Sequence, residues 1–242
     1  FNFCSKKIKA MKIYIVANFT NSQTSRFFEL ARLFANRGHD VLVITSDFSH
    51  SSKSSKKEKP QYETFKTVYL HEPGYKSNVS IKRLWSHYVW GRNVEKYIQN
   101  MSVKPDVIYA SLPTYTAGRL LGKWCNKNNV KYFVDVQDLW PEAFKVAIKN
   151  SFLQQAFLPM EWIANVAYQT ADYVIGVSDT YRDRALKVNN KCKEGLTVYL
   201  GNNGEIFDNA REKYRICKPD DEFWIAYIGT MGYSCLLYTS DA

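Results

Sequence analysis

The sequence predicts a doubly wound α/β domain built around a parallel sheet, and two observations support this. Short runs rich in β-branched residues alternate along the chain with longer segments whose apolar residues recur at helical spacing. The opening segment, residues 11–45, has the pattern of strand, helix and strand, which requires a right-handed crossover between parallel strands. A domain of this class binds its ligands at the carboxyl ends of its strands.

The same alternation continues to residue 200. Strands are expected at residues 11–17, 40–45, 64–70, 106–109, 130–136, 173–177 and 197–200. Helices are expected at residues 27–35, 80–100, 113–124, 142–170 and 179–188. Gly38 stands where a helix C-terminal glycine belongs, and Pro113 suits the first turn of a helix. The Ser- and Lys-rich residues 47–62 are the most polar stretch and are expected to form a mobile loop.

The charge balance favours anionic partners such as phosphates, nucleic acid or an acidic membrane surface. The 242 residues include 33 Lys and Arg against 23 Asp and Glu, a formal net charge of +10. The five cysteines are scattered, with no C-x-x-C pair and no metal-ligand spacing, which favours a reduced, cytosolic setting. No window is apolar enough for a signal peptide or a bilayer span, so membrane contact is expected to be peripheral.

The α/β domain is expected to cover residues 11–207. Met11 opens a typical buried strand, so residues 1–10 are expected to be an upstream extension. A polar linker is expected at 208–222, followed by a strand at 223–228 that would start a second domain. Only 14 residues follow that strand, far fewer than the roughly 100 that a domain needs, so residues 223–242 are expected to be its truncated start. Residues 235–242 have the character of a foreign read-through tail.

Four motifs follow one another along the chain. They are SRFFELA leading to RGHDV at residues 25–41, DVQDLWPE at 135–142, GNNG at 201–204 and YIGTMG at 227–232. This set resembles glycosyltransferase family 4, especially bacterial enzymes that build capsular or O-antigen polysaccharide. The resemblance covers about residues 11–234. Its specific parts are QDLWPE and YIGTMG, because RGHDV is common to many α/β proteins.

The resemblance implies the N-terminal half of a two-domain GT-B fold. Its Rossmann-like N-terminal domain would hold a glycan or lipid-linked acceptor, and the C-terminal domain would bind a nucleotide-sugar donor. The family's hexosyltransferase-type reaction retains the anomeric configuration and usually needs no bound metal, so no metal or other cofactor is expected. The donor-binding basic pair and glutamate motif of the family lie in the C-terminal domain and are absent here, so this chain alone is expected to be inactive.

The carboxylates of the QDLWPE segment are the expected catalytic residues. Asp138 follows a strand at its carboxyl end, and Glu142 lies four residues further on. Glycosyl transfer needs acceptor placement and stabilisation of positive charge at the anomeric carbon, for which carboxylates are suited. We therefore expect Asp138 to position or polarise the acceptor, with Glu142 supporting it. The alternative is that Asp138 caps a helix starting near Pro141.

Residues that bind the donor are expected at two turns. Gly229, Thr230 and Gly232 follow the expected strand of the second domain, where glycines let the backbone approach the donor sugar and diphosphate; a tight turn is the alternative. Asn202 lies in a turn whose amides could reach the same cleft, although a plain turn explains the composition as well.

The loop after the first strand supplies the acceptor-binding candidates. Thr20, Ser25 and Arg26 lie there, and Arg26 could meet a phosphate or an acceptor anion or be solvated. The loop lacks the glycine-rich sequence of many relatives, so it is not expected to bind donor phosphates directly. His39 is expected to make a structural hydrogen bond.

The helix at 80–100 and the residues before it suggest an acceptor-binding or membrane-facing surface. The preceding residues are His71, Glu72 and 75–78, and the helix places the aromatic residues Trp85, Tyr88, Trp90 and Tyr97 beside Lys82, Arg83, Arg92 and Lys96. An interfacial helix has this composition, and so does a core helix with a solvated face. The apolar residues at 152–167 have the same two interpretations. The family resemblance favours peripheral binding at the inner face of the cytoplasmic membrane.

Three rival functions remain open. A nucleotide-sugar epimerase of the same fold shares the alternating pattern, although QDLWPE favours a transferase. An NAD-dependent oxidoreductase is disfavoured because the first strand–helix turn lacks G-x-G-x-x-G. A basic nucleic-acid-binding domain has no recognisable module in this sequence, so no nucleic-acid partner is expected.

Overall fold

The computed structural model describes residues 9–20, 25–57, 59–77, 80–142, 145, 155–201, 204–214 and 217–226. The chain divides into two compact units, Phe1–Asn202 and Asn203–Ala242. Of the predicted site residues, Asn202, Gly229, Thr230 and Gly232 lie outside the described residues.

The first unit is built on a seven-stranded sheet whose neighbouring strands are all parallel. Its strands, in spatial order, are β5 (Lys66–Leu70), β2 (Asp40–Ser46), β1 (Lys12–Val16), β6 (Val107–Leu112), β7 (Lys131–Val136), β8 (Tyr173–Gly176) and β9 (Leu196–Thr197). After β1, the next strands of the sheet, β2 and β5, are added on one side of β1. The chain then crosses to the other side of β1 at β6, so the direction in which strands are added reverses between β1 and β6. The doubly wound α/β prediction is confirmed, and the reversal marks where such a sheet binds ligands.

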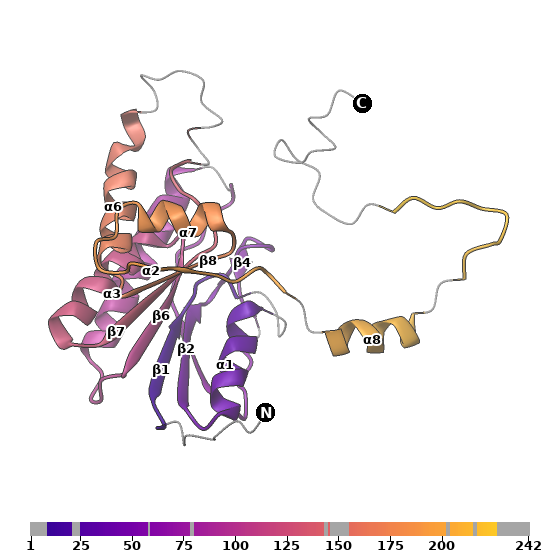
Figure 1. Cartoon of the computed structure of the whole chain (residues 1–242), viewed down its shortest axis with the longest axis horizontal. Helices are drawn as coiled ribbons and strands as arrows, with labels where there is room; N and C mark the ends of the chain where they lie inside the picture. The colour runs from indigo at the N-terminus through magenta and orange to yellow at the C-terminus, as the bar shows by residue number, and fades with distance from the viewer. Residues whose placement is uncertain are drawn as a thin grey trace. The chain divides into compact units, whose positions relative to one another are not determined.

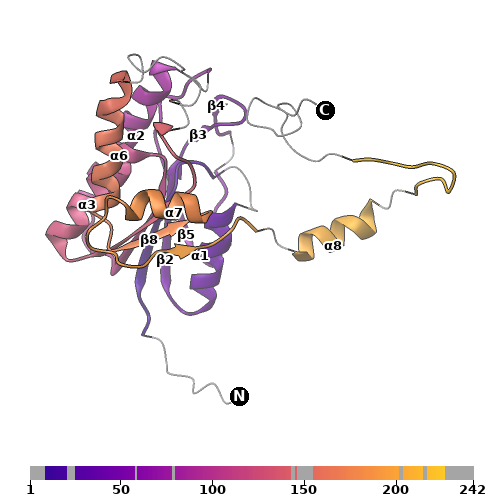
Figure 2. The same cartoon turned by 45° about the horizontal axis from the view of Figure 1, so that its top comes forward.

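Helices cover both faces of the sheet. They are α1 (Arg26–Asn36), α2 (Ile81–Gln99), α3 (Tyr115–Asn128), α6 (Leu158–Gln169) and α7 (Asp179–Leu186), with a 3₁₀ turn at Gln155–Phe157 before α6. Helix α2 packs on α3, and α3 packs on α6, so these three lie side by side on one face, with α1 on the other (Figures 1 and 2).

Strand alternation sends apolar residues into two separate core layers. On β1, Tyr14 and Val16 join the layer under α2, α3, α6 and α7, whereas Ile13 and Ile15 join the layer under α1. The larger layer contains Trp90, fully buried on α2. Gly38 ends α1 with a φ of +84°, and its N–H donates to the Ala35 carbonyl at 2.9 Å, as expected of a helix C-terminal glycine.

Residues 47–62 do not behave as the expected loop throughout. The segment contains a short antiparallel hairpin of β3 (Phe48–Ser49) and β4 (Ser54–Ser55). The Phe48 ring is 6% exposed and lies so close to Gly74 that a Cβ there would be 2.4 Å from Phe48 Cε2. The buried Phe48 side chain therefore anchors this segment, which the polar composition of residues 47–62 does not predict.

The second unit contains α8 (Gly204–Lys213), which occupies the start of the expected linker at 208–222. Residues 223–226, the described part of the strand expected at 223–228, form no strand; Phe223 and Ile225 are 88% exposed. A strand needs a hydrogen-bonding neighbour, and the described part of this unit supplies none. In the described ranges of both units, no helix is long and apolar enough to cross a membrane.

Candidate functional site

The polar residues after β1 meet the ends of neighbouring strands at the carboxyl edge of the sheet. Thr20, 3% exposed, shares a hydrogen bond between its hydroxyl and that of Thr45 at the end of β2. The Lys56 ammonium donates to the Thr20 carbonyl at 2.9 Å. Thr20 therefore joins β1, β2 and the segment after β4, and its side chain supports the edge from inside.

Asn18 is the least satisfied polar side chain at this edge. It is 2% exposed, and neither atom of its amide group has a hydrogen-bond partner within the described structure. A buried amide without partners costs free energy, so such a group in a folded protein calls for a water or a ligand. Its place directly after β1, beside the reversal in strand order, is where an α/β sheet binds ligands.

A buried acid–histidine pair lies at the same edge, next to Phe19, the residue that follows Asn18. Glu72, after β5, accepts a hydrogen bond from the Ser86 hydroxyl at 2.9 Å, and its Oε1 lies 3.9 Å from His87 Nε2 on α2. His87 is 5% exposed, and its Nε2 has no hydrogen-bond partner within the described structure. The ring of Phe19, next to Asn18, meets the His87 ring edge-on at 5.6 Å.

Burial controls the protonation of this pair. Desolvation, with the nearby Arg83 charge, lowers the pKa of His87 to about 3, so its imidazole is neutral at physiological pH. Desolvation also raises the pKa of Glu72, against the opposing effect of its serine hydrogen bonds. Perturbed titratable groups at a ligand-binding edge are typical of functional sites.

The structure places Asp138 beside this pair without directing its carboxylate to it. Its two carboxylate oxygens accept from the Leu139 backbone N–H and the Trp140 indole N–H, each at 3.0 Å. The Trp140 ring stacks on His87 at 5.5 Å, with 4° between the ring planes. Neither of these two hydrogen bonds comes from a backbone N–H within a helix, so the Asp138 carboxylate does not form a helix cap. It holds Trp140 against His87 instead.

Glu142 lies on the other side of this segment and faces α7. Its Oε1 accepts from Arg184 Nε, and Arg184 also donates to Asn165 on α6 at 2.8 Å. Glu142 therefore fixes the QDLWPE segment to two helices. Its role as catalytic support stays a prediction.

Arg26 and Ser25 have structural partners. Arg26 Nε donates to Asp135 Oδ2 at 2.9 Å, and Tyr109 donates to the same oxygen at 2.8 Å. Arg26 also reaches the Val198 carbonyl beyond β9 at 3.0 Å. Ser25 caps α1 by accepting from the Phe28 N–H at 3.4 Å. The structure thus brings Thr20 to the edge and uses Arg26 to join α1, β7 and the end of β9; acceptor binding by these residues stays a prediction.

The sequence places Glu72 in an acceptor-binding or membrane-facing surface, whereas Asn18 and His87 are not among the residues predicted from it. Asn18 carries no motif. The signal for His87 was available on α2, because His87, Trp90, Gly91 and Val94 recur at helical spacing and define its buried face. His39 accepts from the Met11 N–H at 3.1 Å, which confirms its structural hydrogen bond.

Within the described ranges, no three His, Cys, Asp or Glu side chains are grouped to hold a metal ion.

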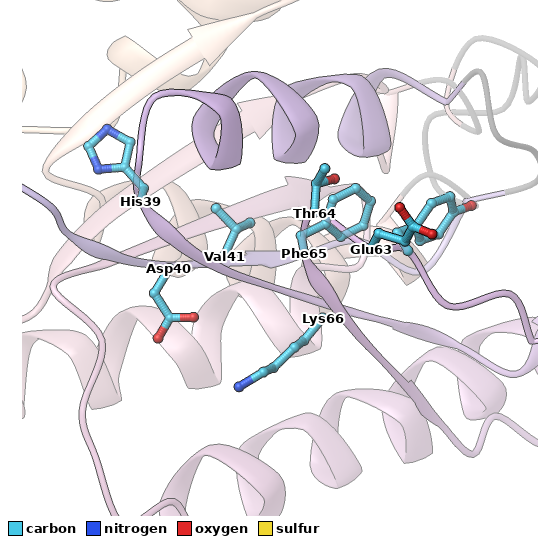
Figure 3. A pocket seen from close by; sticks show the side chains of 8 residues that line it. His39, Asp40, Val41, Glu63, Thr64, Phe65 and Lys66 are labelled. Carbon is cyan, nitrogen blue, oxygen red and sulfur yellow. The ribbon is translucent and has the colours of Figure 1, made fainter.

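A pocket lies away from the carboxyl edge, at the starts of β2 and β5. It is lined by His39, Asp40, Val41, Tyr62, Glu63, Thr64, Phe65 and Lys66 (Figure 3). The starts of the strands are the end of the sheet opposite the ligand-binding edge.

Comparison with known proteins identifies the family. The sequence profile of glycosyltransferase family 4 matches residues 23–194, well over half of the chain. The chain belongs to glycosyltransferase family 4. Its matched region runs from the loop after β1 almost to β9, so it contains Glu72, His87 and the QDLWPE segment.

One solved structure supports the fold of this family 4 chain, and a second is reported beside it. The UGT89C1 protein of Arabidopsis thaliana, crystallised with UDP-L-rhamnose, is 14% identical with a TM-score of 0.51, and the match covers 88% of this chain and 58% of that one. HepE of Anabaena, in complex with UDP and glucose, is 14% identical with a TM-score of 0.47, over 84% of this chain and 50% of that one. The family 4 chain thus spans between half and three fifths of the length of these proteins. No curated protein sequence matches it significantly.

Proposed function

We propose that this family 4 chain is the acceptor-binding half of a glycosyltransferase that moves a sugar from a nucleotide-sugar donor to an acceptor hydroxyl. The observation that carries the proposal is that three buried polar side chains, Asn18, Glu72 and His87, lie at the carboxyl edge beside the strand-order reversal, and that the amide of Asn18 and Nε2 of His87 have no hydrogen-bond partner within the described structure. The UDP-L-rhamnose complex of the Arabidopsis neighbour supports a nucleotide-sugar donor.

The chemistry of these side chains suits a neutral hydroxyl. An asparagine amide both donates and accepts, and a neutral imidazole has one donor and one acceptor nitrogen. In the proposal, Asn18 and His87 Nε2 hydrogen-bond the acceptor hydroxyl and hold it in line with the anomeric carbon, which is the placement that group transfer requires. Asp138 acts as a positioning residue, since it holds the Trp140 ring on which His87 stacks.

Other parts of the proposal rest on the family. We propose that transfer retains the anomeric configuration and needs no bound metal, and that the acceptor is lipid-linked, in surface polysaccharide synthesis. The protein would then work in the cytoplasm at the inner membrane face. The exposed side chains Ile81, Leu84, Trp85 and Tyr88 at the start of α2 support a peripheral membrane contact.

A transfer assay on the complete gene product tests the function. Radiolabelled nucleotide sugars would be supplied one at a time with a lipid extract from the source organism, with and without a chelator. We expect label in an acceptor product regardless of chelator, with the anomeric configuration retained by NMR. His87→Gln should lower kcat/KM by at least about 100-fold if His87 contacts the reacting hydroxyl, whereas Lys104→Ala, on an exposed loop, should not.

The rival enzyme class gives a different result in the same tubes. Isomerised nucleotide sugar formed without acceptor, together with no labelled product, would show the epimerase and exclude the proposed transfer. Unchanged kcat/KM in a folded His87→Gln variant would remove His87 from the site while leaving the transfer itself intact.

A further inference from the structure

The hydroxyl of Tyr115 makes three hydrogen bonds to the segment that carries Trp140 and to α6. Tyr115 is the first residue of α3 and is 4% exposed. Its oxygen lies 3.0 Å from the Asp138 carbonyl oxygen, 3.2 Å from the Trp140 backbone nitrogen and 2.7 Å from the Tyr168 hydroxyl. One buried side chain thus holds the two backbone groups on either side of Leu139.

The partners of the Tyr115 hydroxyl fix the direction of each hydrogen bond. A carbonyl oxygen only accepts and a backbone N–H only donates, so this hydroxyl donates its one proton to Asp138 and accepts from Trp140. Tyr168 must then donate to Tyr115. Burial raises the pKa of both tyrosines, so neither hydroxyl ionises at physiological pH. The arrangement therefore has one proton order, with the donor and both acceptor positions of Tyr115 in use.

Tyr168 is itself held in place and connects the two ends of the QDLWPE segment. It is completely buried on α6, and Arg184 Cζ lies 5.3 Å from the centre of its ring. The same guanidinium donates to Glu142. The hydroxyl of Tyr168 thus acts through Tyr115 on Asp138, while its ring contacts the arginine that binds Glu142. The segment cannot shift without disturbing contacts to α3, α6 and α7.

Trp140 is held at its backbone and at its ring, and the ring contacts His87. Tyr115 accepts from the Trp140 backbone N–H, and Asp138 accepts from its indole N–H at 3.0 Å. The indole lies parallel to the His87 imidazole, whereas the Phe19 ring meets that imidazole edge-on. Because His87 Nε2 has no hydrogen-bond partner within the described structure, the place of the imidazole depends on the rings packed around it.

We propose that Tyr115, oriented by Tyr168, is a positioning residue for sugar transfer that sets the place of His87 through Trp140. The inference rests on the proposed function, which gives His87 its contact with the acceptor hydroxyl. Placement matters because a displacement of about 1 Å can cost roughly 100-fold in the rate of a group transfer. Neither tyrosine belongs to the motifs on which the family resemblance is based.

Tyr132 supplies a matched control for the loss of a buried hydroxyl. It is completely buried in the same core layer, and its hydroxyl donates at 2.8 Å to the carbonyl of Gly118, which is also on α3. That hydrogen bond does not contact the Trp140 segment. A general effect of losing a core hydroxyl would therefore occur in both Tyr115→Phe and Tyr132→Phe.

Histidine NMR on the 242-residue chain at pH 7 reports the place of His87 without any sugar transfer. The chain has four histidines, and the resonance that His87→Gln removes belongs to His87. Because an indole ring shifts the resonances of an imidazole stacked on it, Tyr115→Phe should move the His87 resonance toward its position in the unfolded chain. Tyr168→Phe should move it in the same direction, and Tyr132→Phe should leave it in place.

An unmoved His87 resonance in folded Tyr115→Phe, or an equal movement in Tyr132→Phe, would overturn the inference. Unfolding midpoints show whether each variant is folded. If Tyr115→Phe does not fold, Tyr168→Phe decides the question, since it removes the hydroxyl that orients Tyr115 and keeps both backbone hydrogen bonds. A His87 resonance that stays in place in that variant would then overturn the inference.

A double-mutant cycle on the complete gene product separates positioning from folding. In the transfer assay, Tyr115→Phe should lower kcat about tenfold while the KM for nucleotide sugar changes less than about twofold. In the His87→Gln background the same change should lower kcat less than about twofold, because its effect passes through His87. Full additivity would show that Tyr115 acts elsewhere. Transfer with additive effects defeats only the inference, whereas the expected movement of the His87 resonance without any transfer defeats only the proposed function.

Discussion

At the residue scale, the buried Asp135 carboxylate has two close partners. Asp135 is completely buried on β7, yet one of its oxygens accepts from both Arg26 and Tyr109. Burial raises the pKa of Asp135, and the Arg26 charge opposes that rise. Removing one member of such a pair leaves the other charged and desolvated, which is more costly than loss of the contact alone.

We predict that Asp135→Asn lowers the free energy of unfolding by about 3 kcal/mol, because Arg26 loses its counter-charge in a half-buried place. Asp40→Asn is the control, since the Asp40 carboxylate is 56% exposed and lies 3.4 Å from Lys12. Its loss should cost less than about 1 kcal/mol. Urea unfolding measures both, and equal losses would contradict the special role of burial.

His87 gives a prediction for pH. Unfolded, it takes up a proton below its ordinary pKa of 6.5, whereas folded it does so only near 3. The unfolded state therefore binds more protons in this window, and stability falls as the pH drops from 6.5 toward 3. Between pH 7 and pH 5 this amounts to about 2 kcal/mol, which His87→Gln should remove from the pH dependence measured by urea unfolding. An identical pH profile in the variant would show that His87 is not the group involved.

At the scale of elements, glycines allow α2, α3 and α6 to approach closely. A Cβ added at Gly122 of α3 would lie 2.0 Å from Thr170 Oγ1 at the end of α6. A Cβ at Gly91 of α2 would lie 2.8 Å from the Ala117 backbone nitrogen of α3. Both contacts involve atoms held in the core, so there is little room to relax.

Gly122→Ala should accordingly lower the free energy of unfolding by about 1–3 kcal/mol through overpacking. Gly201→Ala is the matched control, because nothing lies within 4 Å of a Cβ added there, and its effect should stay within about 0.5 kcal/mol. Thermal or urea unfolding compares the two. A neutral Gly122→Ala would mean that α6 can move away from α3 at little cost.

Helix α2 has two faces of different character. Trp90 and Val94 are completely buried, so Trp90 belongs to the core, as the second of the two interpretations of this helix expects. The outer face carries Trp85 and Tyr88, whose rings stack at 5.6 Å. On α6, Leu158 and Trp162 are likewise exposed at 57% and 55%. Exposed aromatic rings on a basic protein are what an interfacial surface would present.

Vesicle co-sedimentation tests this surface. The double variant Trp85→Ser with Tyr88→Ser should weaken binding to anionic vesicles at least tenfold, since burying each large apolar side chain contributes about 1.5–3 kcal/mol. Val103→Ser, which removes an apolar side chain 54% exposed outside the helices, should not. Binding that does not depend on anionic lipid, or that both variants reduce equally, would argue against a membrane-facing role for α2.

At the scale of the whole molecule, the sheet and both core layers belong to the first unit. The described part of the second unit adds α8 and no strand. We therefore predict that a chain ending at residue 202 keeps the unfolding midpoint of the 242-residue chain within about 2 °C, because every strand of the sheet and every described residue of the two core layers lies before residue 203. Differential scanning calorimetry makes the comparison, and a drop of 5 °C or more would show that the second unit stabilises the first.

The sequence by itself determined the class of fold, because period 2 and period 3.6 patterns depend only on local spacing. The strands at 40–46 and 131–136 and the glycine that ends α1 were predictable for this reason. The sequence also predicted the catalytic residues in the QDLWPE segment, which stays a prediction. It did not determine that Asp138 and Glu142 turn to Trp140 and Arg184, since those partners depend on how the segment packs.

Only the tertiary structure decided the candidate site. Asn18 follows β1, Glu72 follows β5 and His87 lies on α2, so no spacing in the sequence links them. Parallel strands bring these distant segments to one edge, and burial then changes the protonation of the side chains that meet there. Local patterns predicted the sheet, and long-range packing determined which residues face its ligand-binding edge.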